Sequence, residues 1–98
     1  MDIRIATILE AVKVPKTKKL MQLKVDTGMD VRTVVSGIAE YFEPEAVVGK
    51  KICLLANLEP REIKGIQSQG MILLAEDASG KLVFVSPEAA VSLGAEVK

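Results

Sequence analysis

Hydrogen-bond donors and cations gather between two apolar runs, residues 52–56 and 71–75, in the second half of the chain. Amide, hydroxyl, ammonium and guanidinium groups in one segment can contact a phosphate, a sugar hydroxyl or a base edge. Met71, at the start of the second run, offers a soft apolar contact, with core packing as the alternative. The side chains that we expect to bind a ligand here are Asn57, Arg61, Lys64, Ser68 and Met71.

A surface connection with solvated charges is the alternative for residues 57–70. Glu59 and Glu62 partly cancel the cations of this segment. Loops on a rigid scaffold often carry binding residues, but connections without a function are common as well. The residue types and their spacing leave both interpretations open.

Lysines form a second concentration of charge near the N-terminus. Residues 11–25 contain five lysines and no acidic residue. Such a basic edge favours phosphate groups through charge and counterion release. Lysines also protect exposed strand edges from association, which is the alternative. The lysines of this cluster that we expect to contact phosphates are Lys16, Lys18, Lys19 and Lys24.

Composition limits the class of protein. The 98 residues make one domain, and 13 basic and 13 acidic residues give a net charge of zero. A protein held to nucleic acid by its global charge is therefore disfavoured. Cys53 is the single cysteine, so no intramolecular disulfide can form and a reducing compartment is expected. No signal peptide or membrane-length apolar run is visible, so we expect a cytoplasmic protein without a membrane partner.

Several kinds of catalytic site are missing from the sequence. The chain has no histidine, and one cysteine cannot form a zinc cluster. No glycine-rich phosphate loop of a known type is present. We therefore expect no catalytic residues, no metal and no cofactor, with an enzyme that uses an unrecognised acid and base as a remote alternative.

Periodicity predicts an all-β domain with one short helix. A long, curved strand with a bulge near residues 6–9 is followed by strands at 20–26 and 31–35, with a turn at 27–30. A helical turn is expected within 41–49, then strands at 50–56, 71–76 and 82–85, and one helical turn at 87–90. Five main strands and a helix between the third and fourth fit an OB-fold barrel with a C-terminal extension. An antiparallel sandwich remains an alternative.

Apolar and aromatic residues indicate which partners to expect. Apolar residues make up 49% of this short chain, so we expect a surface for self-association. The only aromatic residues are Tyr41, Phe42 and Phe84. Binders of single strands usually stack bases on several aromatic residues. DNA is therefore not an expected partner, and a folded RNA recognised by its shape remains open.

The chain resembles the tRNA-binding domain at the C-terminus of bacterial methionyl-tRNA synthetases. Matching segments are residues 2–8, 19–20 with 24–28, 32–39, 44–45 with 48–51, and 56–58 through 68–73. The most specific block combines Asn57-Leu58, Pro60-Arg61, Gly65 and Ser68-Gln69-Gly70-Met71. The resemblance implies a dimeric OB-fold domain over residues 1–98 that binds tRNA with little sequence preference. By position it implies tRNA contacts at Lys19, Lys24, Arg32, Asn57, Arg61, Lys64, Ser68 and Met71.

The function that this resemblance implies is that of an appended module. Such a module forms a homodimer and raises the affinity of a methionyl-tRNA synthetase for tRNA. We accordingly expect a non-catalytic domain taken from a longer methionine–tRNA ligase. The alternatives are a stand-alone dimeric chaperone or tRNA-binding protein of the same fold, and a dimerisation appendage whose tRNA contacts have decayed.

Overall fold

The computed structural model describes residues 2–98, and its central strand is β1 (Ile3–Lys13). The first half of β1 pairs with β4 (Lys51–Leu55) and the second half pairs with β2 (Met21–Asp26), both antiparallel. The register with β2 shifts between Ile8 and Glu10, which is a β-bulge. A bulge bends a strand and increases its twist, so β1 can pair with β4 along one half and with β2 along the other half of a curved sheet. The predicted long, bulged strand is confirmed.

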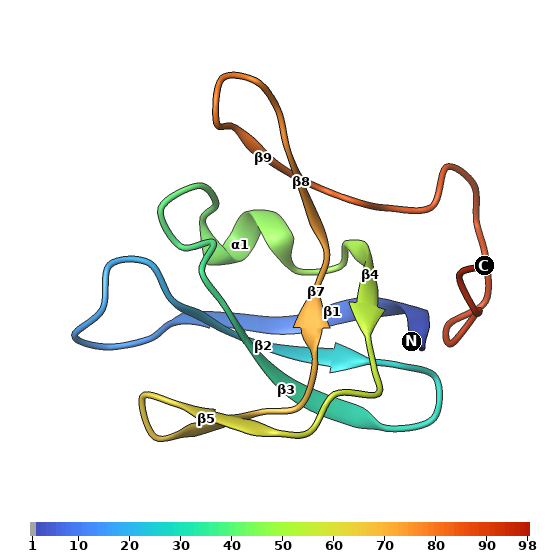
Figure 1. Cartoon of the computed structure of the whole chain (residues 1–98), viewed down its shortest axis with the longest axis horizontal. Helices are drawn as coiled ribbons and strands as arrows, with labels where there is room; N and C mark the ends of the chain where they lie inside the picture. Colours follow the sequence, from blue (N-terminus) through green and yellow to red (C-terminus); the bar gives the residue numbers. More distant parts are fainter. Residues whose placement is uncertain (1) are drawn as a thin grey trace.

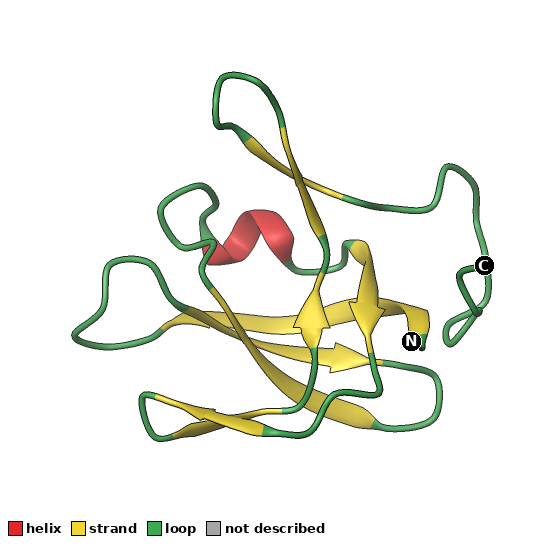
Figure 2. Cartoon of the chain, in the orientation of Figure 1, coloured by secondary structure: helices red, strands yellow, loops and turns green. Residues whose placement is uncertain are grey.

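Five strands form a nearly closed antiparallel barrel (Figure 2). Their order is β3-β2-β1-β4-β7, with β3 at Val31–Ser36 and β7 at Met71–Ile72. Alternate side chains of β2 are fully buried, as the period of the sequence predicted: Met21, Leu23 and Val25. They pack with buried residues of the other strands, including Ile8, Val34, Ile52 and Leu54. The predicted OB-fold architecture is confirmed.

A single turn of helix, α1 (Pro44–Val47), lies between β3 and β4 as predicted (Figure 1). Pro44 occupies the first helical turn, where a missing N–H is tolerated. Val47 is fully buried in the core. The Gly49 N–H donates to the carbonyl of Ile8 at the bulge of β1, at 2.7 Å. The helix is thereby attached to the barrel at the point where β1 changes partner.

Three local predictions were wrong or incomplete. Residues 57–70 are not wholly irregular, because they contain a hairpin of β5 (Arg61–Ile63) and β6 (Ile66–Ser68). The strand predicted at 71–76 is divided after β7, and β8 (Leu74–Glu76) leaves the barrel to pair with β9 (Leu82–Phe84). Residues 87–90 form no helix. Two of these errors concern short local hairpins, 61–68 and 74–84, which the sequence analysis did not predict.

The C-terminal extension returns to the barrel and pairs with β1. The Gly94 N–H donates to the Ile5 carbonyl at 2.8 Å, and the Ile5 N–H donates to the Ala95 carbonyl at 3.0 Å. Gly94 has a φ of +80°, and a Cβ atom there would lie 2.8 Å from the carbonyl oxygen of Thr27. Only glycine fits this close approach. Within residues 2–98 no helix has the length and hydropathy that a membrane span requires.

Candidate nucleic-acid interface

Main-chain and side-chain hydrogen bonds close the barrel between β3 and residues 68–70, at the end of β6. The Gln69 N–H donates to the Thr33 carbonyl at 2.8 Å, and the Thr33 N–H donates to Gln69 Oε1 at 3.0 Å. The Val35 N–H donates to Ser68 Oγ at 2.9 Å, and that hydroxyl donates to the Gly70 carbonyl at 3.3 Å. Ser68 is only 5% exposed. Its predicted role as a ligand contact remains a prediction, and in the structure its hydroxyl holds the barrel wall together.

Arg32 braces the same region from the end of the barrel. Its Nη1 donates to the Ala56 carbonyl at 2.7 Å and reaches the Gln69 carbonyl at 3.5 Å. Its Nε lies 3.2 Å from both carboxylate oxygens of Asp30. The Thr27 hydroxyl and then Arg32 stabilise this carboxylate and hold the pKa of Asp30 below its usual 3.8. Arg32 therefore joins the β2–β3 turn to both ends of the segment 57–70.

The β5–β6 hairpin carries Lys64 at its tip. Lys64 and Gly65 are the two residues of the turn, with φ of +53° and +80°. Positive φ at both positions defines a type I′ turn, which favours asparagine or glycine. Lys64 is exposed. Asn57, at the start of the segment, is also exposed, and its Oδ1 accepts a hydrogen bond from the Asp2 N–H at 3.0 Å.

The loop of residues 14–20, which joins β1 to β2 and is called the basic loop below, has a similar turn. The Thr17 N–H and Oγ1 both reach the Val14 carbonyl, at 3.3 and 2.8 Å. Lys16 is the third residue of this turn and has a φ of +65°, where glycine or asparagine is usual. The Lys19 carbonyl accepts a hydrogen bond from the Ala39 N–H at 2.9 Å, which fixes the other side of the loop.

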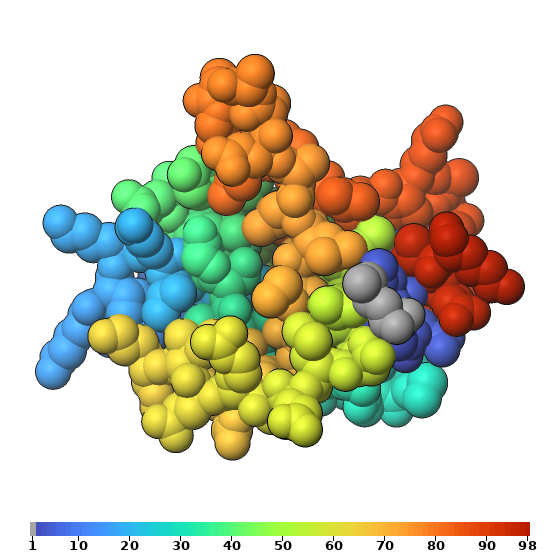
Figure 3. All heavy atoms as spheres, viewed as in Figure 1, coloured from blue at the N-terminus to red at the C-terminus, as the bar shows by residue number. Residues whose placement is uncertain are grey.

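The basic loop and the β5–β6 hairpin flank the same end of β2 and β3. Val35, which is bonded to Ser68 beside the hairpin, lies opposite Gln22 of β2. The basic loop runs directly into Met21, the neighbour of Gln22. Both segments, blue and yellow, reach the left side of the molecule in Figures 1 and 3. Strands 2 and 3 with these two connections form the surface by which OB folds bind oligonucleotides.

The charges at this surface are not all free. Lys24, on the outer side of β2, lies 4.0 Å from a carboxylate oxygen of Glu10, and Lys13 lies 3.3 Å from one of Glu43. Acidic residues from outside the lysine cluster therefore partly neutralise it. Within residues 2–98, five of the predicted cations make no ion pair: Lys16, Lys18, Lys19, Arg61 and Lys64.

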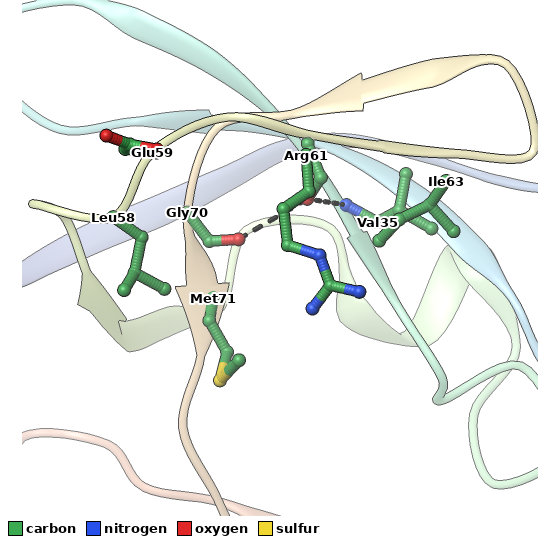
Figure 4. A pocket seen from close by; sticks show the side chains of 8 residues that line it. Val35, Leu58, Glu59, Arg61, Ile63, Gly70 and Met71 are labelled. Carbon is green, nitrogen blue, oxygen red and sulfur yellow. Dashed lines mark hydrogen bonds between the residues drawn. The ribbon is translucent and has the colours of Figure 1, made fainter.

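A small pocket lies between the outer side of β3 and the segment 57–70 (Figure 4). Its walls include Val35, Leu58 and Ile63, together with the predicted contacts Arg61 and Met71. Met71 is 49% exposed, so it is a surface residue and not part of the core. The sequence analysis did not include Val35 or Leu58. Apolar residues on both faces of residues 31–35 were a signal for Val35, and the sequence held no comparable signal for Leu58.

The family model described as "Putative tRNA binding domain" matches residues 3–96. The chain belongs to this family of tRNA-binding domains. It is 66% identical over 97 residues to the methionine–tRNA ligase of Cytophaga hutchinsonii, and 63% identical over 97 residues to that of Flavobacterium johnsoniae. Each alignment covers 99% of this chain and 14% of the ligase. The matching part of these ligases is their C-terminal tRNA-binding part, a non-catalytic domain.

Solved structures share the fold of this tRNA-binding domain. A MetRS-related protein from Pyrococcus horikoshii is 39% identical, with a TM-score of 0.92, and the match covers 99% of this chain and 89% of that one. The chaperone CsaA from Bacillus anthracis superimposes with a TM-score of 0.87 at 23% identity, covering 99% and 90% of the two chains. The second likeness concerns the fold alone.

Proposed function

We propose that this domain binds folded tRNA across the outer side of β2 and β3, between the basic loop and the β5–β6 hairpin. One observation carries the proposal: five cations without an ion pair within residues 2–98 lie on the two connections that flank this surface. OB folds use this surface for oligonucleotides. The exposed residues contact the RNA, whereas Arg32 and Ser68 support the segment that carries the contacts.

The same charges account for a binding module of moderate affinity. Each neutralised phosphate lowers the logarithm of the affinity by about 0.7–0.9 per decade of salt, so about five phosphate contacts give a slope near −4. The net charge of zero adds no general attraction. A module of this kind is most effective when a covalent link raises its local concentration near a second tRNA site. We therefore propose that it acts as an appended domain that increases the affinity of a methionyl-tRNA synthetase for tRNA.

The test is a salt-dependent titration of tRNA with the domain. We expect the double variant Lys18→Glu and Lys19→Glu to bind at least about tenfold more weakly, with a salt slope smaller by about two. The matched control is Lys50→Glu with Lys98→Glu, which makes the same change of charge at exposed residues outside the basic loop and outside the β8–β9 hairpin, and should bind like the wild type. Absence of tRNA binding at tens of micromolar, or equal binding to heparin, would contradict the proposal.

We also propose that the domain pairs with a second copy through its C-terminal part. The β8–β9 hairpin projects from the barrel, and Val83, Val85 and Val91 of this part are 37–41% exposed (Figure 1). Phe84 stacks on Phe42 with ring centroids 4.7 Å apart, which attaches the hairpin to the domain. Apolar residues exposed on a projecting element favour burial against another chain.

A further inference from the structure

The pocket beside β3 combines apolar walls with an unpaired planar cation. Figure 4 shows Leu58 on one side of Met71, and Val35 with Ile63 on the other. The side chain of Arg61 extends from β5 into the space between Met71 and Val35. Within residues 2–98 this group has neither a hydrogen bond nor an ion pair. A flat apolar ligand could therefore lie against both the thioether and the guanidinium plane.

The remaining polar atoms of the pocket are already engaged or turned away. Ser68 Oγ is bonded to Val35 and Gly70, as described above. The Glu59 carboxylate points away from Arg61 and Met71 in Figure 4. The pocket consequently offers two surfaces on which a ligand can stack, the Met71 thioether and the Arg61 guanidinium plane. It has few groups that could form hydrogen bonds with the edge of that ligand.

We propose that this pocket receives one unpaired nucleobase of the bound RNA. The proposal rests on the function proposed above, because Lys64 and the basic loop would hold the phosphates on either side of that base. Unstacked bases of folded RNA are often held between apolar side chains and arginine planes. Since the walls leave few free polar atoms, the pocket accepts any unpaired base and does not distinguish one base from another. The domain thus selects folded RNA that presents an extruded base, and the identity of the base matters little.

Methyl NMR of the methionines tests the proposal directly. The chain has four methionines. Met71 lies in the pocket, Met29 is 86% exposed on the β2–β3 turn, and Met21 is fully buried. A base stacked on Met71 should shift its methyl signal upfield through the ring current. The signals of Met29 and Met21 should not move and serve as internal controls.

The probes are tRNA and two RNA hairpins, one with normal loop nucleotides and one with abasic loop nucleotides. We expect tRNA and the normal loop to shift the Met71 signal, and the abasic loop to bind with the same salt slope but without that shift. Equal shifts with both hairpins, or no shift with tRNA at saturation, would overturn the proposed pocket while leaving tRNA binding intact. If tRNA does not bind at all, the result contradicts both the proposed function and the proposed pocket.

Arg61→Lys separates stacking from charge, because lysine keeps the positive charge and lacks the plane. We expect the normal-loop hairpin to bind about fivefold more weakly with an unchanged salt slope, by analogy with stacking on other side chains. The abasic hairpin should bind both proteins equally. An equal loss of affinity for the two hairpins would overturn the proposal, because it would show that Arg61 contacts only phosphate.

Discussion

Two lysines of the proposed interface adopt backbone conformations that lysine disfavours. Lys16 and Lys64 have φ of +65° and +53°, and they are the only residues other than glycine with positive φ in residues 2–98. The left-handed conformation costs an ordinary residue about 1–2 kcal/mol. Both residues stand at turns where glycine or asparagine would relieve this strain. Strain retained in two exposed turns is typical of a functional site.

Lys64→Asn should make the domain more stable and its binding weaker. Asparagine followed by Gly65 is a preferred pair for a type I′ turn, so we expect a gain of about 0.5–1 kcal/mol in the free energy of unfolding. Loss of one cation should lower the salt slope of tRNA binding by about one. Denaturant unfolding and salt titration measure the two effects.

The control for this prediction is Lys18→Asn. Lys18 is exposed in the basic loop and does not have positive φ. This variant should lose affinity for tRNA without gaining stability. A Lys64→Asn protein that is no more stable than the wild type would show that the turn is not strained.

At the scale of elements, the segment 57–70 closes the barrel and also carries several of the proposed ligand contacts. Ser68 and Gln69 provide side-chain partners for the free N–H groups of β3, where no regular strand pairing continues. The Gly70 backbone has a φ of +157°, and a Cβ atom there would lie 3.1 Å from both Leu54 Cδ1 and the Leu55 carbonyl oxygen. The spacing of Ser-Gln-Gly is therefore explained by closure of the barrel, whereas Lys64 and Arg61 remain free for a ligand.

Ser68→Ala should destabilise the fold more than it affects binding. It leaves the buried N–H of Val35 without its acceptor, which costs about 1–3 kcal/mol. We expect a lower midpoint of denaturant unfolding, and an unchanged salt slope of tRNA binding for the folded protein. Ser92→Ala is the matched control, because the Ser92 hydroxyl makes no hydrogen bond within residues 2–98. A stable Ser68→Ala protein with a large loss of affinity would instead make Ser68 a direct contact.

At the scale of the whole molecule, the proposed tRNA surface and the projecting hairpin use different parts of the chain. The basic loop and β5–β6 lie beside β2 and β3, whereas β8 and β9 pair only with each other. A substitution in one of these surfaces therefore leaves the residues of the other surface unchanged. A dimer would also present two basic surfaces to RNA and so increase the effective affinity.

Val83→Glu should weaken self-association without preventing folding. The side chain is 41% exposed on β9, so a charge there is tolerated in a monomer but is costly in an apolar interface. We expect sedimentation velocity to show a dimer for the wild type at micromolar concentration and a monomer for the variant. Val12→Glu, at a residue that is 56% exposed on the outer side of β1, is the control and should remain a dimer. A monomeric wild type would contradict the prediction.

Much of this fold follows from local patterns that need no distant partner. Alternation in residues 21–26 predicts which side of β2 is buried, and Pro44 with Gly49 marks the short helix. The change of parity in β1 predicts its bulge, because a slip by one residue exchanges the two faces of a strand. The motif around residues 57–71 carried the resemblance to the tRNA-binding domain, and the family model that matches residues 3–96 confirms that family.

The sequence by itself determined the strands of the barrel, the family and the residues that could contact RNA. Only the tertiary structure decided which of those residues are free to do so. Ser68 and Arg32 have the same chemistry as a ligand contact, but their donors and acceptors are used to close the barrel. Met71 belongs to an apolar run and yet lies at the surface. β7 is the last strand in the order of the sheet, and the side chain of Ile72 enters the core, so the side chain of the adjacent Met71 points outward. The folded chain brings residues 33–35 and 68–69 together, and the N–H groups of Thr33 and Val35 in β3 find their acceptors there.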